Sequence, residues 1–285
     1  MKVLKNLLKF ISITILTIYI ITSCFISIAF STILNKDYII QKLEENNFYS
    51  ETHKLVESNF ENYIYQSGFE EDVIQNICTE EKVKNDINIM LSNIYDGTKQ
   101  EIDTIEIANK LNENIEKSGV KNSENEKSIQ QFVEHICNEY TNTLIHTKYE
   151  EKVNDIYIKI VESLNEIYRI IQTIFILDII VIIAINKKNI SKVVQYFEIT
   201  LFAASFFEAS TWHIIISKVN IQGIKIFNEV FSKSIVIIIQ ETITKILSLS
   251  IGTMIMGIIF CLIYIIINIL KLPKEKIEKN KTKEI

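Results

Sequence analysis

The sequence predicts an all-α integral membrane protein with four transmembrane helices and an extracytoplasmic helical-bundle domain between the first and second of them. Three observations lead to this prediction. The apolar residues gather in long runs with few charged residues, which is typical of membrane spans. The 285 residues include one proline and six glycines, so turn and strand-edge signals are scarce. Lysines gather beside the apolar runs, which is typical of the cytoplasmic ends of spans.

The first span is the run from Phe10 to Leu34, which has no charged residue over 25 positions. About 20 residues suffice to cross a bilayer. The run includes Ile21-Thr22-Ser23-Cys24, which matches the cleavage signal of a lipoprotein, so lipid attachment at Cys24 is the alternative. A signal peptide has an apolar core of about 7–15 residues followed by polar chain. Because the residues after Cys24 stay apolar, the sequence favours a permanent anchor.

Three further apolar runs complete the set of spans. The first of the three is short by itself, and we expect the helix before it to continue into it. These runs are Ile170–Ile185, Val193–Ile216 and Leu247–Leu270.

The lysines beside these runs predict the orientation of the chain. With four spans, all three lysine clusters fall on one side of the membrane, and cytoplasmic loops are the ones that carry excess lysine. We therefore expect a multi-pass protein of a bacterial cell membrane with both termini in the cytoplasm. The clusters are Lys2, Lys5 and Lys9; Lys187, Lys188 and Lys192; and Lys271, Lys274, Lys276, Lys279, Lys281 and Lys283.

These patterns divide the chain into four parts. The parts are residues 1–34, with the cytoplasmic N-terminus and first span; residues 35–168, an acidic extracytoplasmic helical domain; residues 169–271, with spans two to four, a cytoplasmic link at 186–192 and an amphipathic outer segment at 217–246; and residues 272–285, a lysine-rich cytoplasmic tail.

The segment from Asn35 to Tyr168 is strongly acidic, with 13 lysines against 27 aspartates and glutamates, a net charge of −14. Nucleic-acid binding requires a basic face, so nucleic acid is not an expected partner. The expected partners are the lipid bilayer and either another protein or a second copy of the chain.

The extracytoplasmic domain reads as four amphipathic helices whose apolar stripes face one core. Small polar residues cap their N-termini and glycines close their C-termini. The expected helices run from a Ser50 cap to Gly68, from a Thr79 cap to Gly97, from Asp103 to Ser118 before Gly119, and onward from a capping box at Ser123 and Glu126. The expected loops are Asp96–Gln100 and Gly119–Asn125.

Two features join this domain to the spans. The fourth helix has no breaker before the second span, so we expect it to enter the membrane, with a bend near His146 to Tyr149. The amphipathic segment 217–246 has two alternatives: it lies on the outer leaflet, or it packs against the base of the bundle.

Four cysteines are present. Cys24 and Cys261 fall in spans, where each reads as a small apolar residue. Cys78 and Cys137 fall in the extracytoplasmic domain, where a disulfide would close a loop of about 60 residues and contribute about 4 kcal/mol. Buried free cysteines are the alternative, because both lie on apolar stripes.

No catalytic or metal-binding motif is evident. The four histidines lie in no zinc-binding arrangement, and no glycine-rich phosphate loop or placed nucleophile is present. We therefore expect no metal, no cofactor and no enzymatic activity. The histidines are His53, His135, His146 and His213.

Three acidic residues interrupt the spans, namely Asp178, Glu198 and Glu208. Charged residues inside a membrane are costly and often mark function. Asp178 and Glu198 lie about eight and about six residues from the cytoplasmic link, which places them at nearly the same depth. There they could share a proton or hold a cation. The alternatives are structural: a protonated Asp178, a Glu198 directed toward the interface, and a Glu208 within an outer polar belt.

These observations lead to two functional hypotheses. The first is a non-enzymatic interaction or sensing module of the cell envelope, acting through its extracytoplasmic domain. The alternative is a component of cation- or proton-coupled transport that uses the intramembrane carboxylates.

Overall fold

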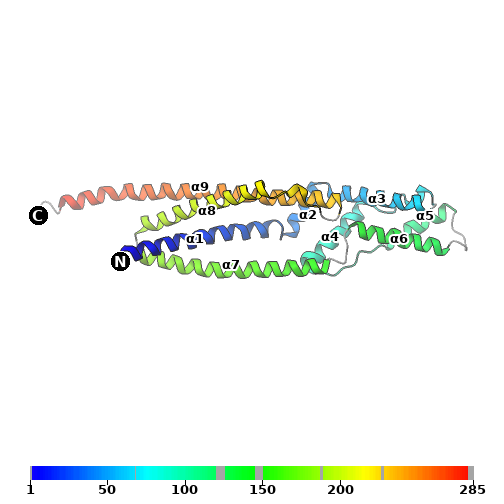
Figure 1. Ribbon diagram of the computed structural model, residues 1–285, viewed down its shortest axis with the longest axis horizontal. Helices are drawn as coiled ribbons and strands as arrows, with labels where there is room; N and C mark the ends of the chain where they lie inside the picture. The colour runs from blue at the N-terminus through cyan, green and yellow to red at the C-terminus, as the bar shows by residue number, and fades with distance from the viewer. Residues whose placement is uncertain are drawn as a thin grey trace. The chain divides into compact units, whose positions relative to one another are not determined.

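The computed structural model describes residues 2–67, 69–119, 126–144, 150–186, 189–225 and 228–281. Within these residues every regular element is a helix, which confirms the all-α prediction (Figure 1). The α-helices are α1 (Lys2–Ser31), α2 (Lys36–Glu45), α3 (Phe48–Ser67), α4 (Glu80–Asp96), α5 (Ile105–Lys117), α6 (Glu126–Leu144), α7 (Glu150–Asn186), α8 (Ile190–Lys218) and α9 (Glu229–Lys281), with short 3₁₀ helices η1 (Glu71–Ile74) and η3 (Ile221–Gly223).

Among the residues that the structure describes, four helices are long and apolar enough to cross a membrane, as the sequence predicts. A helical region of five shorter helices, α2 to α6, separates the first span from the second. The spans lie within Asn6–Ser31, Glu150–Asn186, Ile190–Lys218 and Glu229–Leu270.

The chain forms two compact units, each described here by itself. The span unit comprises Met1–Ser31, Glu162–Ile221 and Ile239–Ile285, and the bundle unit comprises Thr32–Val161 and Gln222–Ile238. Helices α7 and α9 each contribute residues to both units.

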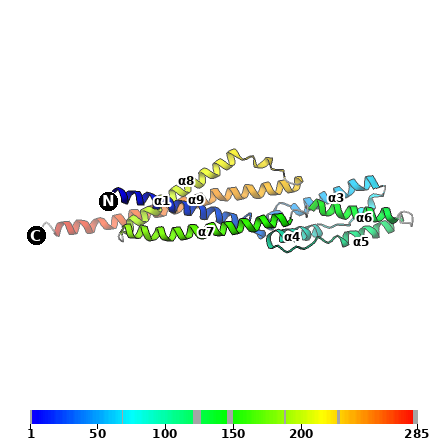
Figure 2. The same ribbon diagram turned by 60° about the horizontal axis from the view of Figure 1, so that its bottom comes forward.

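The bundle unit has one apolar core, to which each of its helices contributes one face. Helix α3 packs along α6, and α5 packs on α6 and η1 (Figure 2). The largest fully buried side chains of this unit are Phe48, Phe60, Ile77, Ile87, Met90, Ile107, Leu111, Ile115, Ile136, Tyr140 and Leu144.

Several helix ends follow from local sequence. The side chain of Thr79 caps α4 by accepting a hydrogen bond from the backbone N–H of Lys82 at 3.2 Å. Gly97 ends the same helix in the left-handed conformation, with φ +69°, where a side chain would be strained. Gly119 follows α5 with φ +72°. The boundaries expected at Thr79, Gly97 and Gly119 are therefore confirmed.

The cap expected at Ser50 is wrong. Helix α3 already begins at Phe48, because Phe48 and Tyr49 are buried in the core as part of its first turn. Helix α2 was not predicted from the sequence. Asn35 caps its start, because the Asn35 side chain accepts a hydrogen bond from the backbone N–H of Tyr38 at 3.0 Å. Gly68, Ser123 and the bend at 146–149 lie outside the described residues.

The amphipathic segment is not a separate element, since α9 runs without a break from Glu229 through the fourth span to Lys281. Of the two alternatives for this segment, the structure shows packing against the bundle. Phe231 meets Phe48 edge to face with ring centroids 4.8 Å apart, and Lys233 Nζ donates to Glu51 Oε1 at 2.7 Å.

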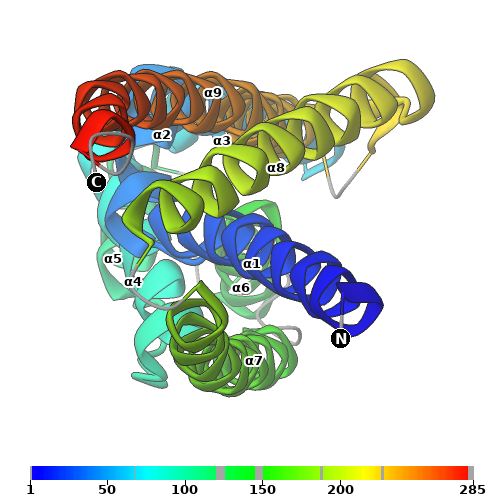
Figure 3. The ribbon, with the colours of Figure 1, turned by 90° about the vertical axis from the view of Figure 1, so that its left-hand side faces the viewer.

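In the span unit, α1 lies between α8 and α7 (Figure 3). Leu16 of α1, Ile182 of α7 and Tyr196 of α8 meet in a small buried cluster. Tyr19 stacks on Phe175 with ring centroids 3.9 Å apart. Many other apolar side chains of the spans are exposed in the structure and few are fully buried, which suits a surface that faces lipid.

Candidate functional site

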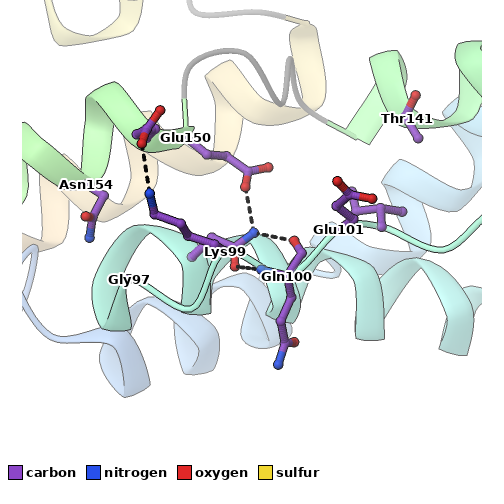
Figure 4. Close-up of a pocket in the computed structure, with 10 residues that line it drawn as sticks. Gly97, Lys99, Gln100, Glu101, Thr141, Glu150 and Asn154 are labelled. Atoms are coloured by element: carbon purple, nitrogen blue, oxygen red, sulfur yellow. Dashed lines mark hydrogen bonds and ion pairs between the residues drawn. The ribbon is translucent and has the colours of Figure 1, made fainter.

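Two candidate sites lie in different units of the molecule. One is an open pocket of about 590 Å³ in the bundle unit (Figure 4). The other is a set of buried polar groups in the span unit. The pocket is lined by Asn93, Gly97, Lys99, Gln100, Glu101, Ile102, Thr141, Glu150, Glu151 and Asn154.

The pocket is built around the side chain of Asn93, near the end of α4. Its Nδ2 donates to the backbone oxygen of Gln100 at 2.8 Å and to Glu150 Oε2 at 2.7 Å. Its Oδ1 accepts from the backbone N–H of Gln100 at 2.9 Å and from Thr98 Oγ1 at 2.8 Å. One amide thus folds the loop after Gly97 back onto α4 and ties it to the first residue of α7.

Two further bonds join the start of α7 to this wall. Asn154 Nδ2 donates to the backbone oxygen of Ile94 at 2.8 Å, and Lys99 Nζ donates to Glu151 Oε1 at 3.0 Å. Figure 4 shows Asn154 and Thr141 at opposite ends of the pocket, with Lys99 and Gln100 between them. The pocket therefore has one wall from α4 and its loop and another from α7.

Among the described residues that line the pocket, three are glutamates and one is a lysine, and they are Glu101, Glu150, Glu151 and Lys99. The hydrogen bond from Lys99 to Glu151 raises the pKa of this lysine, so Lys99 stays charged at neutral pH. Such a surface accepts hydrogen bonds and attracts positive charge. No group of three or more metal-ligating side chains occurs among the described residues.

Asp178 lies in the span unit and is buried, with 5% of its surface exposed. Its polar neighbours are Ser12 of α1 and Tyr196 of α8. One of its carboxyl oxygens, Oδ2, has no hydrogen-bond partner. Asp178 therefore faces the interior of the span unit.

Glu198 lies elsewhere on the helix surface, against Cys261 of α9. Asp178 and Glu198, which by sequence could share a proton or hold a cation, have different neighbours, and helix geometry gives the reason. Tyr196 is the α8 residue beside Asp178, and a residue two positions further along points about 200° around the axis. Similar depth thus does not place the two carboxyl groups together.

Glu208 is the most buried acidic side chain of the span unit, with 1% of its surface exposed. It faces Cys24 of α1 and Thr253 of α9. Neither of its carboxyl oxygens has a hydrogen-bond partner. A residue this enclosed does not belong to an interfacial belt, although Trp212 is half-buried and His213 exposed one turn further along α8.

Cys78 and Cys137 are free thiols in the structure. The Sγ of Cys78 donates to the backbone oxygen of Thr79 at 3.7 Å, and that of Cys137 donates to Thr104 at 3.9 Å. The disulfide between them stays a prediction, which a comparison of intact masses with and without reduction tests.

Sequence reasoning identified the loop Asp96–Gln100 but not the pocket beside it. A signal was nevertheless present. Asp86 and Asn93 lie seven residues apart, so both fall on the same face of α4 beside its apolar stripe, and both are buried. A polar residue repeated on a buried face requires long-range partners, which here come from α6, the loop and α7.

The chain matches no protein-family model, no curated protein and no solved structure.

Proposed function

We propose that this chain is a non-enzymatic sensing module of the bacterial cell envelope, which binds a cationic ligand in the pocket of its bundle unit. The observation that carries this proposal is that the first turns of α7 form one wall of the pocket. Glu150, Glu151 and Asn154 belong to the first turns of α7, and the same unbroken helix is a candidate membrane span. A ligand held there touches the end of a helix that enters the membrane.

The charge of the pocket supports a cationic ligand. Among the described residues of its lining, three glutamates outnumber one lysine, and the whole segment from Asn35 to Tyr168 has a net charge of −14. A cation that replaces Lys99 beside Glu151 would change the bonds between the α4 loop and α7. Because a ligand shifts a conformational equilibrium only through contacts that differ between the states, these bonds are where such a shift begins.

The proposal places the bundle unit outside the cell and both termini in the cytoplasm. The lysine clusters around the spans support this orientation. A thiol introduced by Glu134→Cys should react in intact cells with a membrane-impermeant maleimide, mapped by mass spectrometry. A thiol introduced by Asn280→Cys should react only after lysis. The opposite pattern would reverse the orientation.

Binding can be tested with trilysine peptide and the purified full chain in detergent micelles, by calorimetry at low ionic strength. We expect saturable binding that weakens at least about threefold in Glu101→Gln and weakens further as salt is added. Glu134→Gln is the matched control, since Glu134 is an exposed glutamate of α6 outside the pocket. Equal losses in the two variants would show that only overall charge matters and would refute a site.

A second candidate function is proton- or cation-coupled transport. The observation that favours it is the burial of Asp178 and Glu208, each with at least one carboxyl oxygen that has no hydrogen-bond partner. This hypothesis predicts that Asp178→Asn or Glu208→Gln abolishes proton or cation flux into sealed vesicles while protein abundance is unchanged. Flux that persists in both variants would remove it.

A further inference from the structure

Glu208 occupies an environment that disfavours its charged form. It lies ten residues before the end of α8 at Lys218, about 15 Å along the helix. Its side chain is 1% exposed, and neither carboxyl oxygen accepts a hydrogen bond. An ionised carboxylate buried without a partner costs several kcal/mol, so the group is expected to hold a proton.

The neighbours of Glu208 suit a carboxylic acid. Thr253 Oγ1 already donates its proton to the backbone oxygen of Leu249 at 3.0 Å, so it has only lone pairs to offer. In this arrangement it can accept a hydrogen bond from a protonated carboxyl group, whereas donating one to a carboxylate requires its hydroxyl to turn away from Leu249. Cys24, the neighbour on α1, supplies at most a weak thiol donor.

Donors for the other protonation state are also present. Trp212 Nε1, one turn beyond Glu208 on α8, and Ser23 Oγ, adjacent to Cys24 on α1, are buried atoms without a hydrogen-bond partner. An indole N–H and a hydroxyl are the groups that a carboxylate accepts from. Thr253 is thus an acceptor beside the acid form, and two unpartnered donors lie within one turn of Glu208 and of Cys24 along their helices.

We propose that Glu208 is a proton-binding site of the span unit, which exchanges its carboxyl proton with water and changes its hydrogen-bond partners as it does so. On release the O–H bond breaks, its electron pair stays on the carboxylate oxygen, and the proton passes to a water molecule. This site is independent of the ligand proposed for the bundle unit, so either proposal can fail without the other.

The groups that could titrate beside Glu208 are few. Cys24 faces it from α1, and α9 presents the uncharged Thr253. Asp178 of α7 has Ser12 and Tyr196 as its neighbours instead. On α8 itself, His213 is exposed and lies next to Trp212 in the chain. A test must therefore separate Glu208 from His213 and Cys24.

The chain offers a built-in reporter, because Trp212 is its only tryptophan. The first experiment is a titration of intrinsic fluorescence between about pH 4 and pH 10, on the full chain in lipid vesicles. We expect one transition in the native chain, and the same transition in His213→Gln, Cys24→Ala and Glu198→Gln. Glu208→Gln should remove it. A transition that survives in Glu208→Gln, or that is absent from the native chain, would overturn the proposal.

A second measurement needs no variant and so does not depend on whether Glu208→Gln folds. Hydrophobic carbodiimide reacts with protonated carboxyl groups in apolar surroundings, and mass spectrometry maps the modified residue. We expect modification at Glu208 that decreases as pH rises through the fluorescence midpoint and that sodium or potassium leaves unchanged. If sodium or potassium protected Glu208 from modification, the ligand of this site would be a metal ion and not a proton. No modification at any pH would refute the site.

Discussion

The two units of the molecule treat buried polar groups in opposite ways. In the bundle unit, Asp86 is 3% exposed and fully partnered: it accepts from Lys82 Nζ at 2.8 and 3.1 Å and from the hydroxyl of Tyr140 at 2.6 Å. In the span unit, Glu208 is equally buried and has no hydrogen-bond partner. Both acids are enclosed by apolar helices, but only Asp86 accepts hydrogen bonds.

The same contrast extends beyond this pair of acids. Nine buried side-chain atoms of the described residues have no hydrogen-bond partner; eight belong to the span unit, and Thr52 Oγ1 alone belongs to the bundle unit. Buried polar groups in folded proteins are nearly all satisfied, so a concentration of exceptions requires an explanation. A satisfied acid such as Asp86 stabilises one structure, whereas an unsatisfied acid such as Glu208 is available for a ligand or a proton.

Removal of the satisfied acid should have the largest effect. Asp86→Leu leaves the buried hydroxyl of Tyr140 without its acceptor and the ammonium of Lys82 with only the backbone oxygen of Asp103, 2.7 Å away. We expect a loss of about 3–5 kcal/mol, the usual cost of breaking a buried pair. Chemical denaturation of the full chain, followed by circular dichroism, measures it. Glu106→Ala, which breaks an exposed pair with Lys110, should cost less than 1 kcal/mol.

The start of α9 provides the next test, because it belongs to the bundle unit although its helix continues as a span. Phe231→Ala removes the contact with Phe48 and should destabilise the bundle unit by about 3 kcal/mol. Lys233→Ala is the matched control on the same turns, since its ion pair with Glu51 is exposed and worth under about 1 kcal/mol. If Phe231→Ala and Lys233→Ala lost hydrogen-exchange protection equally, Phe231 would not be a core residue.

Alkaline pH should destabilise the bundle unit. Burial raises the pKa of the Cys78 thiol to about 12 and, with a contribution from Glu44, that of Tyr49 to about 12. These groups ionise earlier in the unfolded chain, so the stability they confer is complete below about pH 9 and is lost as pH rises toward 12. We expect a loss on the order of 2 kcal/mol between pH 8 and pH 11. Cys78→Ala should reduce the loss, and a flat profile would contradict the burial of these groups.

The parts of this fold that the sequence predicts are those that local patterns determine. Long apolar runs identify all four spans, and the Thr79 cap and the glycines at 97 and 119 mark helix ends, because each of these signals is local in the sequence. Local patterns did not predict the residue at which α3 starts or the face of α8 on which the Glu198 side chain lies. Both depend on distant neighbours: the core around Phe48, and the face that α8 turns toward α1.

The candidate sites were predictable to a lesser extent. Charge inside a span identified Asp178 and Glu208 as unusual, but depth counted along a helix does not tell which helix a side chain faces. Nothing local indicates that Asn93 would bond Glu150, which is 57 residues further along the chain. Long-range hydrogen bonds of this kind are properties of the packed unit.

Substitution by leucine should have the opposite effect on stability at Glu208 from its effect at Asp86. Glu208→Leu removes a buried polar group that has no hydrogen-bond partner, so it removes a desolvation cost. We expect a stability equal to that of the native chain or greater by about 1 kcal/mol. Thermal denaturation in detergent, monitored by circular dichroism, compares the two variants directly. A loss as large as that in Asp86→Leu would mean that Glu208 has partners, and the contrast between the units would not hold.

The smallest effect on stability should come from Lys99→Ala, which separates ligand binding from folding. The ion pair of Lys99 with Glu151 joins side chains that are 81% and 77% exposed, so its loss should leave the free energy of unfolding essentially unchanged. The pocket nevertheless loses the one positive charge among the described residues that line it, and Glu151 becomes available to a cation. Trilysine should therefore bind Lys99→Ala more tightly than the native chain at low ionic strength, whereas Lys110→Ala, outside the pocket, should change binding less. Weaker binding of trilysine to Lys99→Ala would contradict competition between Lys99 and the cation for Glu151.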